Sequence, residues 1–366
     1  MYKPESNLNN ILSKRVIKIR KHLLQWSQSN PRDLPWKHTK DPYRIWVSEI
    51  ILQQTRVAQG IAYYHQFLQA FPSIGHLAQA DIDQVMKVWE GLGYYRRAKH
   101  MHDTAKHLVR EKHGVFPRTY TELLALKGVG PYTAAAIASF AYDLSHPVID
   151  GNVSRVVSRL FAVTEPVDSG KGKKLISGFV NHLIDPDSPS AFNQAIMDFG
   201  SAICIPGRPQ CNRCPVSSCC EGRKADLEHQ LPKKRSAVPK RNRYFYYLKI
   251  HKNEHVFIRK RRDNDIWQNL YEFYLLEYDV DVPLNHFLNR VNLNITVRAG
   301  SEVFVQDLTH QRIHARFAEV DLIGTGNQLA AEGYIPVNQK KLRTFAFPKV
   351  IDCYLRDKAL NLNPSF

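Results

Sequence analysis

The sequence lacks the features that mark membrane proteins and exported proteins. None of its apolar runs approaches the ~18 consecutive residues that a membrane-spanning helix needs. Its first residues, Met1-Tyr-Lys-Pro-Glu-Ser, lack the apolar stretch of a signal peptide. Internal repeats and low-complexity tracts are absent as well. We therefore expect a cytoplasmic protein with no membrane segment and no secretion signal.

Acidic residues are scarce relative to basic ones. Asp and Glu total 34 against 51 Lys and Arg, which gives a formal net charge of +17. Such an excess indicates a polyanionic partner, and nucleic acid is the commonest polyanion in cells. The alternative is a basic protein whose lysines are merely solvated.

Cysteine is rare outside one short stretch, since only Cys353 lies apart from the group at 204–220. Disulfides are therefore the weakest explanation of that group. Four of its members have the spacing Cys204-x6-Cys211-x2-Cys214-x5-Cys220. Zinc is an alternative, although four-cysteine zinc sites usually take their ligands in two separated pairs. The uneven gaps favour a [4Fe–4S] cluster, and either Cys219 or Cys220 could supply the fourth ligand.

The pattern of apolar residues divides the chain into two domains, which 366 residues can accommodate. Residues 1–225 show helical periodicity with no convincing strand, so we expect an all-α domain. Residues 226–243 are basic and contain prolines, which predicts an exposed linker. Residues 244–366 should form an α+β domain, because they contain runs rich in aromatic and β-branched residues: Tyr244–Ile250, His255–Ile258, Tyr271–Leu276 and Ile313–Val320.

Residues 119–142 predict a helix-hairpin-helix. Thr119 and Glu122 have the spacing of a capping box that opens a short helix through Leu126. A tight turn and an alanine-rich helix follow, and backbone N–H groups at such a helix start can grip a DNA phosphate. A plain helical turn is the alternative. The residues expected at this contact are Lys127, Gly128 and Gly130.

A helix-hairpin-helix followed by a four-cysteine loop resembles the endonuclease III superfamily of base-excision DNA glycosylases, and within it the MutY-type adenine DNA glycosylases. The matching motifs are Leu34-Pro35-Trp36, Ser48–Thr55, Gly91–Tyr95, Val129–Thr133, Asp150–Val153 and the cysteine loop. Beyond residue 244, Arg259, Trp267 and Leu270–Phe273 resemble the early strands of the family's Nudix-like domain.

The resemblance implies a monomeric enzyme that hydrolyses the N-glycosidic bond of adenine mispaired with 8-oxoguanine or guanine in double-stranded DNA. It also implies a [4Fe–4S] cluster in the loop 204–220. The second domain would read 8-oxoguanine, and it would have no Nudix activity of its own because the Arg-Glu-x2-Glu-Glu signature is missing after residue 244.

Breaking the bond to adenine needs an acid at the base and a negative charge near the sugar, as in glycoside hydrolysis. Glu49 lies in an otherwise apolar helix, where burial would raise the pKa of its carboxyl group. The resemblance makes Glu49 the proton donor, Asp150 the carboxylate that stabilises the sugar cation, and Asn152 its hydrogen-bonding neighbour. The alternatives are a helix-surface glutamate at 49 and a simple N-cap at 150.

Tyr132 stands where bifunctional relatives carry a Schiff-base lysine. A tyrosine cannot form that imine, so this position predicts a glycosylase without lyase activity. The resemblance suggests that Tyr132 supports Asp150, and the alternative is simple packing beside the hairpin.

Removal of a base from a duplex requires base flipping, and something must fill the gap. Gln54 and the second tyrosine of Gly93-Tyr94-Tyr95 match the family's intercalating positions, although Tyr94 could be core. Further DNA contacts are expected at Trp36 and at Lys37, where the family usually has Arg. Leu308-Thr309-His310 aligns with the family's Phe-Ser-His reader loop.

Three other interpretations remain open on the sequence alone. An endonuclease III-like glycosylase/lyase would act on other bases. A non-catalytic iron–sulfur DNA-binding protein would explain the charge, the hairpin and the cysteines, and a structural zinc protein would explain the cysteine loop alone.

Overall fold

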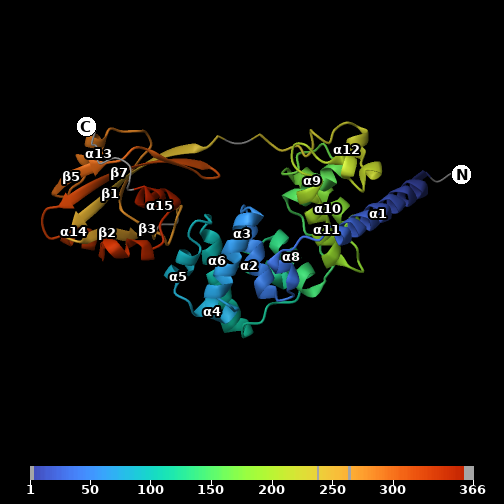
Figure 1. Ribbon diagram of the computed structural model, residues 1–366, viewed down its shortest axis with the longest axis horizontal. Helices are drawn as coiled ribbons and strands as arrows, with labels where there is room; N and C mark the ends of the chain where they lie inside the picture. Colours follow the sequence, from blue (N-terminus) through green and yellow to red (C-terminus); the bar gives the residue numbers. More distant parts are fainter. Residues whose placement is uncertain (1–3, 237–238, 263–264, 358–366) are drawn as a thin grey trace. The chain divides into compact units, whose positions relative to one another are not determined.

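The computed structural model describes residues 4–236, 239–262 and 265–357 (Figure 1). These residues form two compact units. Unit 1 contains residues up to 68 together with 107–236, and unit 2 contains 69–106 together with the described residues from 239 onward. The segment 69–106 thus groups with the C-terminal part of the chain, whereas the sequence predicts it in the helical domain.

Unit 1 is helical, and no strand occurs before Arg241 among the described residues. This agrees with the all-α character that the periodicity of apolar residues predicts for residues 1–225. Its helices are α1 (Pro4–Ser29), η1 (Pro35–His38), α2 (Pro42–Leu52), α3 (Val57–Ala70, which ends in unit 2), α7 (Tyr120–Leu124), α8 (Pro131–Tyr142), α9 (Gly151–Leu160), α10 (Gly170–Leu183), α11 (Pro189–Ala202), η2 (Cys211–Arg213), η3 (Ser217–Cys219) and α12 (Glu221–Lys224).

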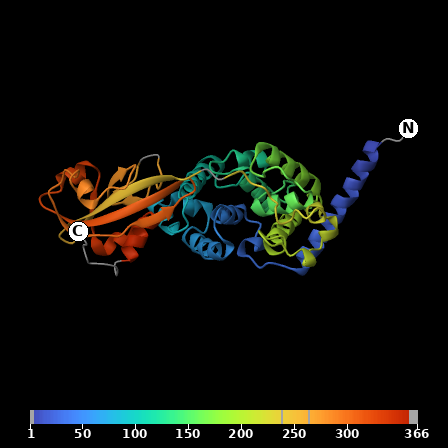
Figure 2. The same cartoon turned by 90° about the horizontal axis from the view of Figure 1, so that it is seen from above.

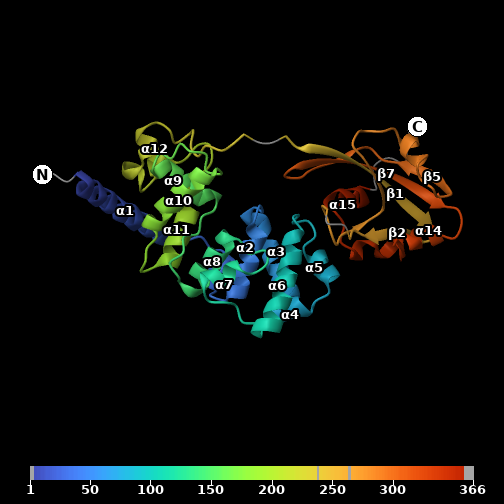
Figure 3. The ribbon, with the colours of Figure 1, turned by 180° about the vertical axis from the view of Figure 1, so that it is seen from behind.

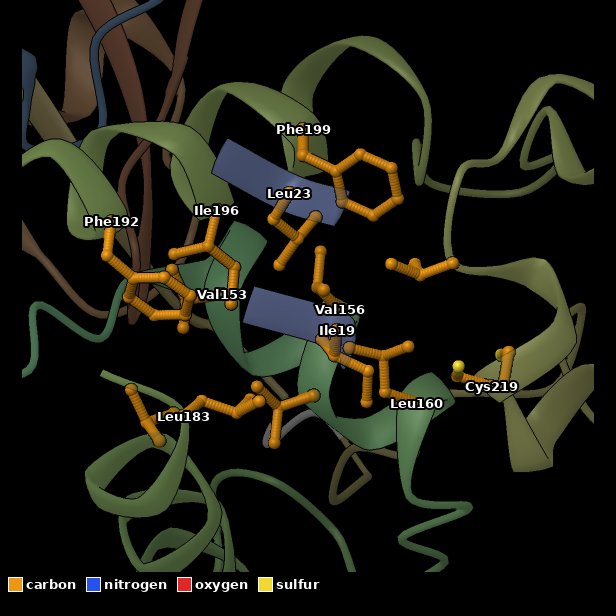
Figure 4. Close-up of a cluster of buried hydrophobic side chains, with 14 of the residues drawn as sticks. Ile19, Leu23, Val153, Val156, Leu160, Leu183, Phe192, Ile196, Phe199 and Cys219 are labelled. Atoms are coloured by element: carbon orange, nitrogen blue, oxygen red, sulfur yellow. The ribbon is translucent and has the colours of Figure 1, made fainter. Parts of the chain in front are cut away.

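One hydrophobic core of unit 1 lies where α1, α9, α10 and α11 meet (Figure 4). Ile19 and Leu23 of α1 pack against Val153 and Val156 of α9, while Phe199 enters from α11. The apolar residues of α9 recur at helical spacing, so one face of that helix is buried. This core fixes α9, whose first turn follows Asp150.

The helix-hairpin-helix is formed by α7 and α8, which lie side by side (Figure 3). The hydroxyl of Thr119 accepts the N–H of Glu122, as an N-cap does. The predicted capping box is incomplete, because the Glu122 carboxylate accepts from the Thr119 hydroxyl (2.7 Å) and not from its backbone. Gly128 has φ 78°, a left-handed value that glycine adopts without strain.

Unit 2 combines three helical segments from 69–106 with a mixed sheet. The helices are α4 (Ile74–Gln79), α5 (Ile82–Val88), α6 (Arg96–Lys112, which ends in unit 1), α13 (Leu284–Leu288), α14 (Asn327–Ala331), η4 (Gln339–Thr344) and α15 (Lys349–Arg356). The strands are β1 (Arg241–Lys252), β2 (His255–Lys260), β3 (Tyr271–Glu272), β4 (Tyr274–Tyr278), β5 (Ile295–Gly300), β6 (Phe304–Asp307), β7 (Gln311–Leu322) and β8 (Ile335–Asn338).

The sheet is built around the two long strands β1 and β7, which run parallel and adjacent (Figure 2). The main strand order is β3-β2-β1-β7-β5, and the other strand pairs of the described residues are antiparallel. The strand predicted over Tyr271–Leu276 is divided, because β3 pairs with β2 while β4 pairs with β1. The fully buried Phe273 lies at the break.

The basic stretch 226–243 is not wholly an exposed linker. Leu231 is only 2% exposed, and its carbonyl accepts from the buried Arg159 side chain (2.9 Å). Backbone hydrogen bonds hold residues 233 and 235 on unit 1, and β1 already begins at Arg241. Residues 237–238 of the predicted linker lie outside the described residues.

Candidate active site

A cleft of about 1110 Å³ in unit 1 brings together the four predicted catalytic residues and some of the predicted DNA contacts. Its walls come from α2, from the start of α8, from the start of α9 and from α11. The predicted residues that line it are Trp36, Lys37, Glu49, Gln54, Gly130, Tyr132, Asp150 and Asn152.

Glu49 is the buried acid of this cleft. It lies on α2 with only 4% of its surface exposed. Burial raises the pKa of Glu49 to about 7; a hydrogen bond from the Tyr132 hydroxyl (2.6 Å) opposes the shift, and the charge of Asp150 adds to it. The carboxyl can therefore hold a proton near neutral pH, as the sequence predicts.

Asp150 caps α9 and also lines the cleft, so its role as an N-cap does not remove it from the site. One carboxylate oxygen accepts the N–H of Val153 and the other accepts the Asn152 amide, each at 2.7 Å. Burial raises the pKa of Asp150, while these hydrogen bonds lower it. The Asn152 amide oxygen in turn accepts from Arg155 (2.8 Å), which fixes the amide so that its N–H₂ points to Asp150.

Tyr132 begins the first turn of α8, directly after Gly130 and Pro131. Burial raises the pKa of Tyr132 well above its ordinary value, so the phenol stays protonated and donates to Glu49. From the sequence, Tyr132 was expected to support Asp150. Its hydroxyl donates to Glu49 instead, and Asp150 acts on Tyr132 through its charge.

Asp198 is a site residue that sequence reasoning missed. It is a buried acid on α11 whose carboxylate pairs with Lys37 and with Arg32 (3.2 Å), and all three side chains line the cleft. The cleft wall thus presents cationic donors beside an anionic acceptor. One aspartate in an amphipathic helix looks like a surface charge in sequence, and only its place on the buried face of α11 would have revealed it.

Gln54, a predicted intercalating residue, and Tyr94, the neighbour of the other, have unusual backbones. Gln54 has φ 61° and is exposed at the cleft. Tyr94 has φ 49° and is 47% exposed, whereas Tyr95 is buried with its hydroxyl near the carbonyl of Phe347 (3.4 Å). The sequence predicts the second tyrosine as the intercalating residue, whereas in the structure Tyr94 and not Tyr95 presents its ring to solvent. Left-handed non-glycine residues are costly and concentrate at functional sites.

Arg97 holds Tyr94 in this conformation. Its guanidinium group lies over the rings of Trp89 and Tyr94, at 5.1 and 5.6 Å from their centroids, and donates to the carbonyl of Gly93 (3.1 Å). Burial lowers the pKa of Arg97 to about 10, which still leaves it charged at neutral pH.

Leu308, Thr309 and His310 form the tip of the hairpin between β6 and β7 in unit 2. The N–H of Leu308 donates to the carbonyl of Gln311 (2.8 Å), which closes the turn and leaves Thr309 and His310 exposed. Within the same unit the hydroxyls of Thr309 and Tyr94 lie 2.5 Å apart. Lys127 and Gly128 are exposed on the turn between α7 and α8 and do not line the cleft.

Four cysteines line one small apolar cavity: Cys204, Cys211, Cys214 and Cys220. Cys219 does not line it and packs in the core beside Leu160 (Figure 4). Burial raises the pKa of Cys214 to about 12, and the other three cavity thiols add to the shift, so the four are electrostatic neighbours. Arg159 donates to the Cys204 sulfur (3.3 Å).

In the described part of the chain, no three His, Cys, Asp or Glu side chains converge as the ligands of one metal ion do. Each cysteine of a [4Fe–4S] cluster binds a different iron, so four cluster ligands surround a larger centre. No helix among the described residues is long and apolar enough to cross a membrane.

Two family models match the chain. Residues 47–179 match the HhH-GPD superfamily of base excision DNA repair proteins, and residues 245–357 match the NUDIX domain. The first contains Glu49, Tyr132 and Asp150, and the second contains the hairpin at Thr309.

Several curated relatives are adenine DNA glycosylases. The chain is 36% identical to one from Buchnera aphidicola subsp. Baizongia pistaciae over 255 residues, which cover 69% of this chain and 72% of the relative. It is 32% identical to one from Buchnera aphidicola subsp. Schizaphis graminum over 296 residues, or 80% and 84% of the two chains. It is 40% identical to the human protein over 225 residues, which cover 59% of this chain and 41% of the human one.

Solved structures match a little over half of the chain. A thermostable thymine-DNA glycosylase is 27% identical, with a TM-score of 0.54 over 58% of this chain and 98% of that one. An endonuclease III–DNA complex, 21% identical with a TM-score of 0.50 over the same shares, shows a likeness of fold alone.

Proposed function

The chain belongs to the adenine DNA glycosylases, and we propose that it removes adenine paired with 8-oxoguanine or guanine, with Glu49 as acid and Asp150 as the charge beside the sugar. Glycosylases of this family are hydrolases of N-glycosyl bonds that act on DNA. The observation that supports these roles most directly is the pairing of a protonatable Glu49 with Asp150 in one cleft.

The reaction proceeds by proton transfer and bond cleavage. Glu49 gives its proton to a ring nitrogen of adenine, and the electrons of the C1′–N9 bond leave with the base. The sugar becomes an oxocarbenium-like cation opposite Asp150, whose charge lowers the energy of the transition state. Water then adds to C1′ and returns a proton to Glu49. The products are free adenine and an abasic site, and no group in Tyr132 can form the imine that strand cleavage requires.

The wall formed by Arg32, Lys37 and Asp198 has hydrogen-bonding groups that complement adenine. The exposed edge of adenine offers an acceptor at N7 and a donor at its N6 amino group. Lys37 or Arg32 can donate to N7 while the Asp198 carboxylate accepts from the amino group, because all three line the cleft. The ion pairs hold these side chains in place before the base arrives.

We assign a [4Fe–4S] cluster to Cys204, Cys211, Cys214 and Cys220, and we leave Cys219 out because it does not line their cavity. When bound, the cluster would cross-link the loop 204–220, and hydrolysis itself needs no electron transfer. Cysteine thiols must lose their protons to bind iron. Because burial raises the pKa of Cys214, we expect its thiol to ionise only when the positive charge of a bound metal is beside it.

Residues of each unit are suited to contact the duplex substrate. In unit 2, Thr309 and His310 have the hydroxyl and ring nitrogens to contact 8-oxoguanine, and Tyr94 presents an exposed ring that can stack on a base. In unit 1, Gln54 can fill the space that the flipped base leaves. Nothing in this arrangement requires a second copy, so we propose a monomer that works in the cytoplasm, at the nucleoid if the source is bacterial.

The test is a labelled duplex with one A:8-oxoguanine pair, treated with alkali after reaction. The wild type should yield cleaved strand only after alkali. Glu49→Gln should keep the hydrogen bond from Tyr132 yet lower the single-turnover rate by roughly 10²–10⁴-fold, the usual contribution of a general acid. Its dissociation constant for the mispair should stay within about threefold of the wild type, because protonation belongs to the transition state.

Two results would contradict the proposal. Strand cleavage without alkali would indicate a lyase. Equal losses of binding and turnover in Glu49→Gln would remove the acid role from that residue.

A further inference from the structure

A group of basic residues beside the cleft has no part in the chemistry described so far. It combines two segments that lie about sixty positions apart in the sequence, and we call it the basic flank. All its members are exposed. They are Lys171, Lys173 and Lys174 of α10 and Lys233, Lys234 and Arg235 of the stretch that follows the cysteine loop.

Two hydrogen bonds donated by backbone N–H groups hold the two segments together. The N–H of Val167 donates to the carbonyl of Lys233 (3.0 Å), and the N–H of Arg235 donates to the Asp168 carboxylate (3.0 Å). These bonds bracket Lys234. Its backbone is therefore fixed against the loop before α10, and its side chain extends from an anchored position.

The loop before α10 folds closely over that helix because Gly172 has no side chain. A Cβ at this position would lie 2.0 Å from the carbonyl oxygen of Pro166. Gly172 thus permits the arrangement that brings α10 and the stretch 233–235 onto one surface. Upstream, the bond from Arg159 to the Leu231 carbonyl anchors the same stretch.

The basic flank keeps a positive excess. Glu165 and Asp168 are the acids in 165–174 and 233–235; Glu165 pairs with Lys171 (2.6 Å), and Asp168 accepts from a backbone N–H. A surface with this balance attracts a polyanion.

The basic flank also borders the reaction site. Lys173 and Lys234 line the cleft that contains Glu49 and Asp150. A nucleotide rotated into the cleft stays joined to its neighbours, so the phosphates beside it must cross the rim. Lys173 and Lys234 therefore lie where the DNA strand that carries the flipped nucleotide is expected to pass.

We propose that the basic flank binds the phosphates next to the flipped adenine, so that the first residues after the cysteine loop form part of the DNA-binding surface. This inference rests on the proposed function, because it requires a base in the cleft. The contact is to the sugar–phosphate backbone and carries no sequence preference.

The test compares salt dependence of binding in the full-length protein. All variants are made in the Glu49→Gln background, so that a duplex with one A:8-oxoguanine pair stays intact during the measurement. The double variant Lys173→Gln/Lys234→Gln removes two charges at the rim. Lys18→Gln/Lys112→Gln removes two exposed charges that do not line the cleft.

Loss of two phosphate contacts should lower the slope of log affinity against log salt by about 1.4–1.8. The gap in Kd between the rim variant and its parent should therefore shrink by roughly tenfold as salt rises from 50 to 200 mM. The control pair should keep the parent's slope, and Lys173→Arg/Lys234→Arg should restore it because the charge returns.

A rim variant with the parent's slope and Kd would overturn the proposal. So would an equal loss in the control pair, since the effect would then reflect net charge alone. Failure of the proposed function is seen separately, as absence of adenine release by the protein that retains Glu49.

Discussion

At the scale of a residue, the burial of Glu49 makes the reaction sensitive to pH. Its pKa is raised to about 7, and the protonated form is the active one. The single-turnover rate of excision should therefore be highest below pH 7 and fall by about tenfold per unit well above it. Rates measured between pH 5.5 and 9 on the A:8-oxoguanine duplex would show this descending limb. The limb should vanish in Glu49→Gln, and its persistence there would assign it to another group.

The positions of Cys219 and Cys220 give a prediction that separates neighbouring residues. Cys220→Ser should lose the brown colour and visible absorption of an iron–sulfur protein, because the side chain lines the four-cysteine cavity. Cys219→Ser should keep the absorption yet lower the free energy of unfolding by about 1–3 kcal/mol, since it buries a hydroxyl in an apolar core. Absorption spectra and thermal unfolding of both variants decide the question. A colourless wild type that contains zinc would refute the cluster itself.

The residues that sequence reasoning found and missed differ in one respect. Glu49 and Asp150 lie within motifs, so type and spacing were enough to single them out. Asp198 is marked only by its ion pairs with Lys37 and Arg32, which bring distant segments together. The choice between Tyr94 and Tyr95 depends on which ring the turn at Gly93 buries, and adjacent tyrosines carry no signal for that.

At the scale of an element, the stretch after the cysteine loop should matter for the stability of unit 1. Arg159 is buried and donates to the carbonyl of Leu231, so a chain that ends at residue 225 leaves that donor without this partner. We expect a fragment of residues 1–225 to have a free energy of unfolding lower than that of a fragment of 1–236 by ~1–3 kcal/mol, the cost of an unsatisfied buried donor. It should therefore unfold at a lower temperature. Thermal unfolding of the two fragments is the measurement. Equal stability would show that the Arg159–Leu231 hydrogen bond contributes little.

The long helices were predictable because apolar spacing and caps agree along them, as in α9 after Asp150. The six-residue α4 is too short for its bounds to be predicted, since it offers hardly two turns of periodicity. The strands β5, β6 and β8 were missed. Most of their residues are exposed or only half-buried, so these strands lack the run of buried apolar residues from which a strand is predicted.

At the scale of the whole molecule, the choice of substrate should depend on the hairpin at Thr309. Thr309→Val with His310→Ala removes a hydroxyl and a ring nitrogen that can contact the oxidised base, each worth ~1–3 kcal/mol of discrimination. The preference for A:8-oxoguanine over A:G should shrink accordingly, while excision stays measurable. Kinetics on the two mispairs test this.

Thr309→Ser is the matched control, because it keeps the hydroxyl and should keep most of the preference. A double variant with undiminished preference would place recognition of 8-oxoguanine outside this hairpin. Leu308→Ala should have a smaller effect than either polar change.

The discontinuity of unit 2 has a consequence for the time course of synthesis. Glu90 accepts the backbone N–H of Phe347, a residue that follows it by 257 positions, and Asp83 accepts from the hydroxyl of Tyr271. At translation rates of about 5–20 residues per second, roughly 13–50 s separate the two partners of the first hydrogen bond. During that interval the surface of α5 that carries Asp83 faces the ribosome's surroundings without its final neighbours. A chain whose synthesis stops between residues 236 and 347 thus contains all the cleft residues and the four cysteines of the cavity, while Phe347, the partner of Glu90, is still missing. We expect quality-control proteases to attack that surface first.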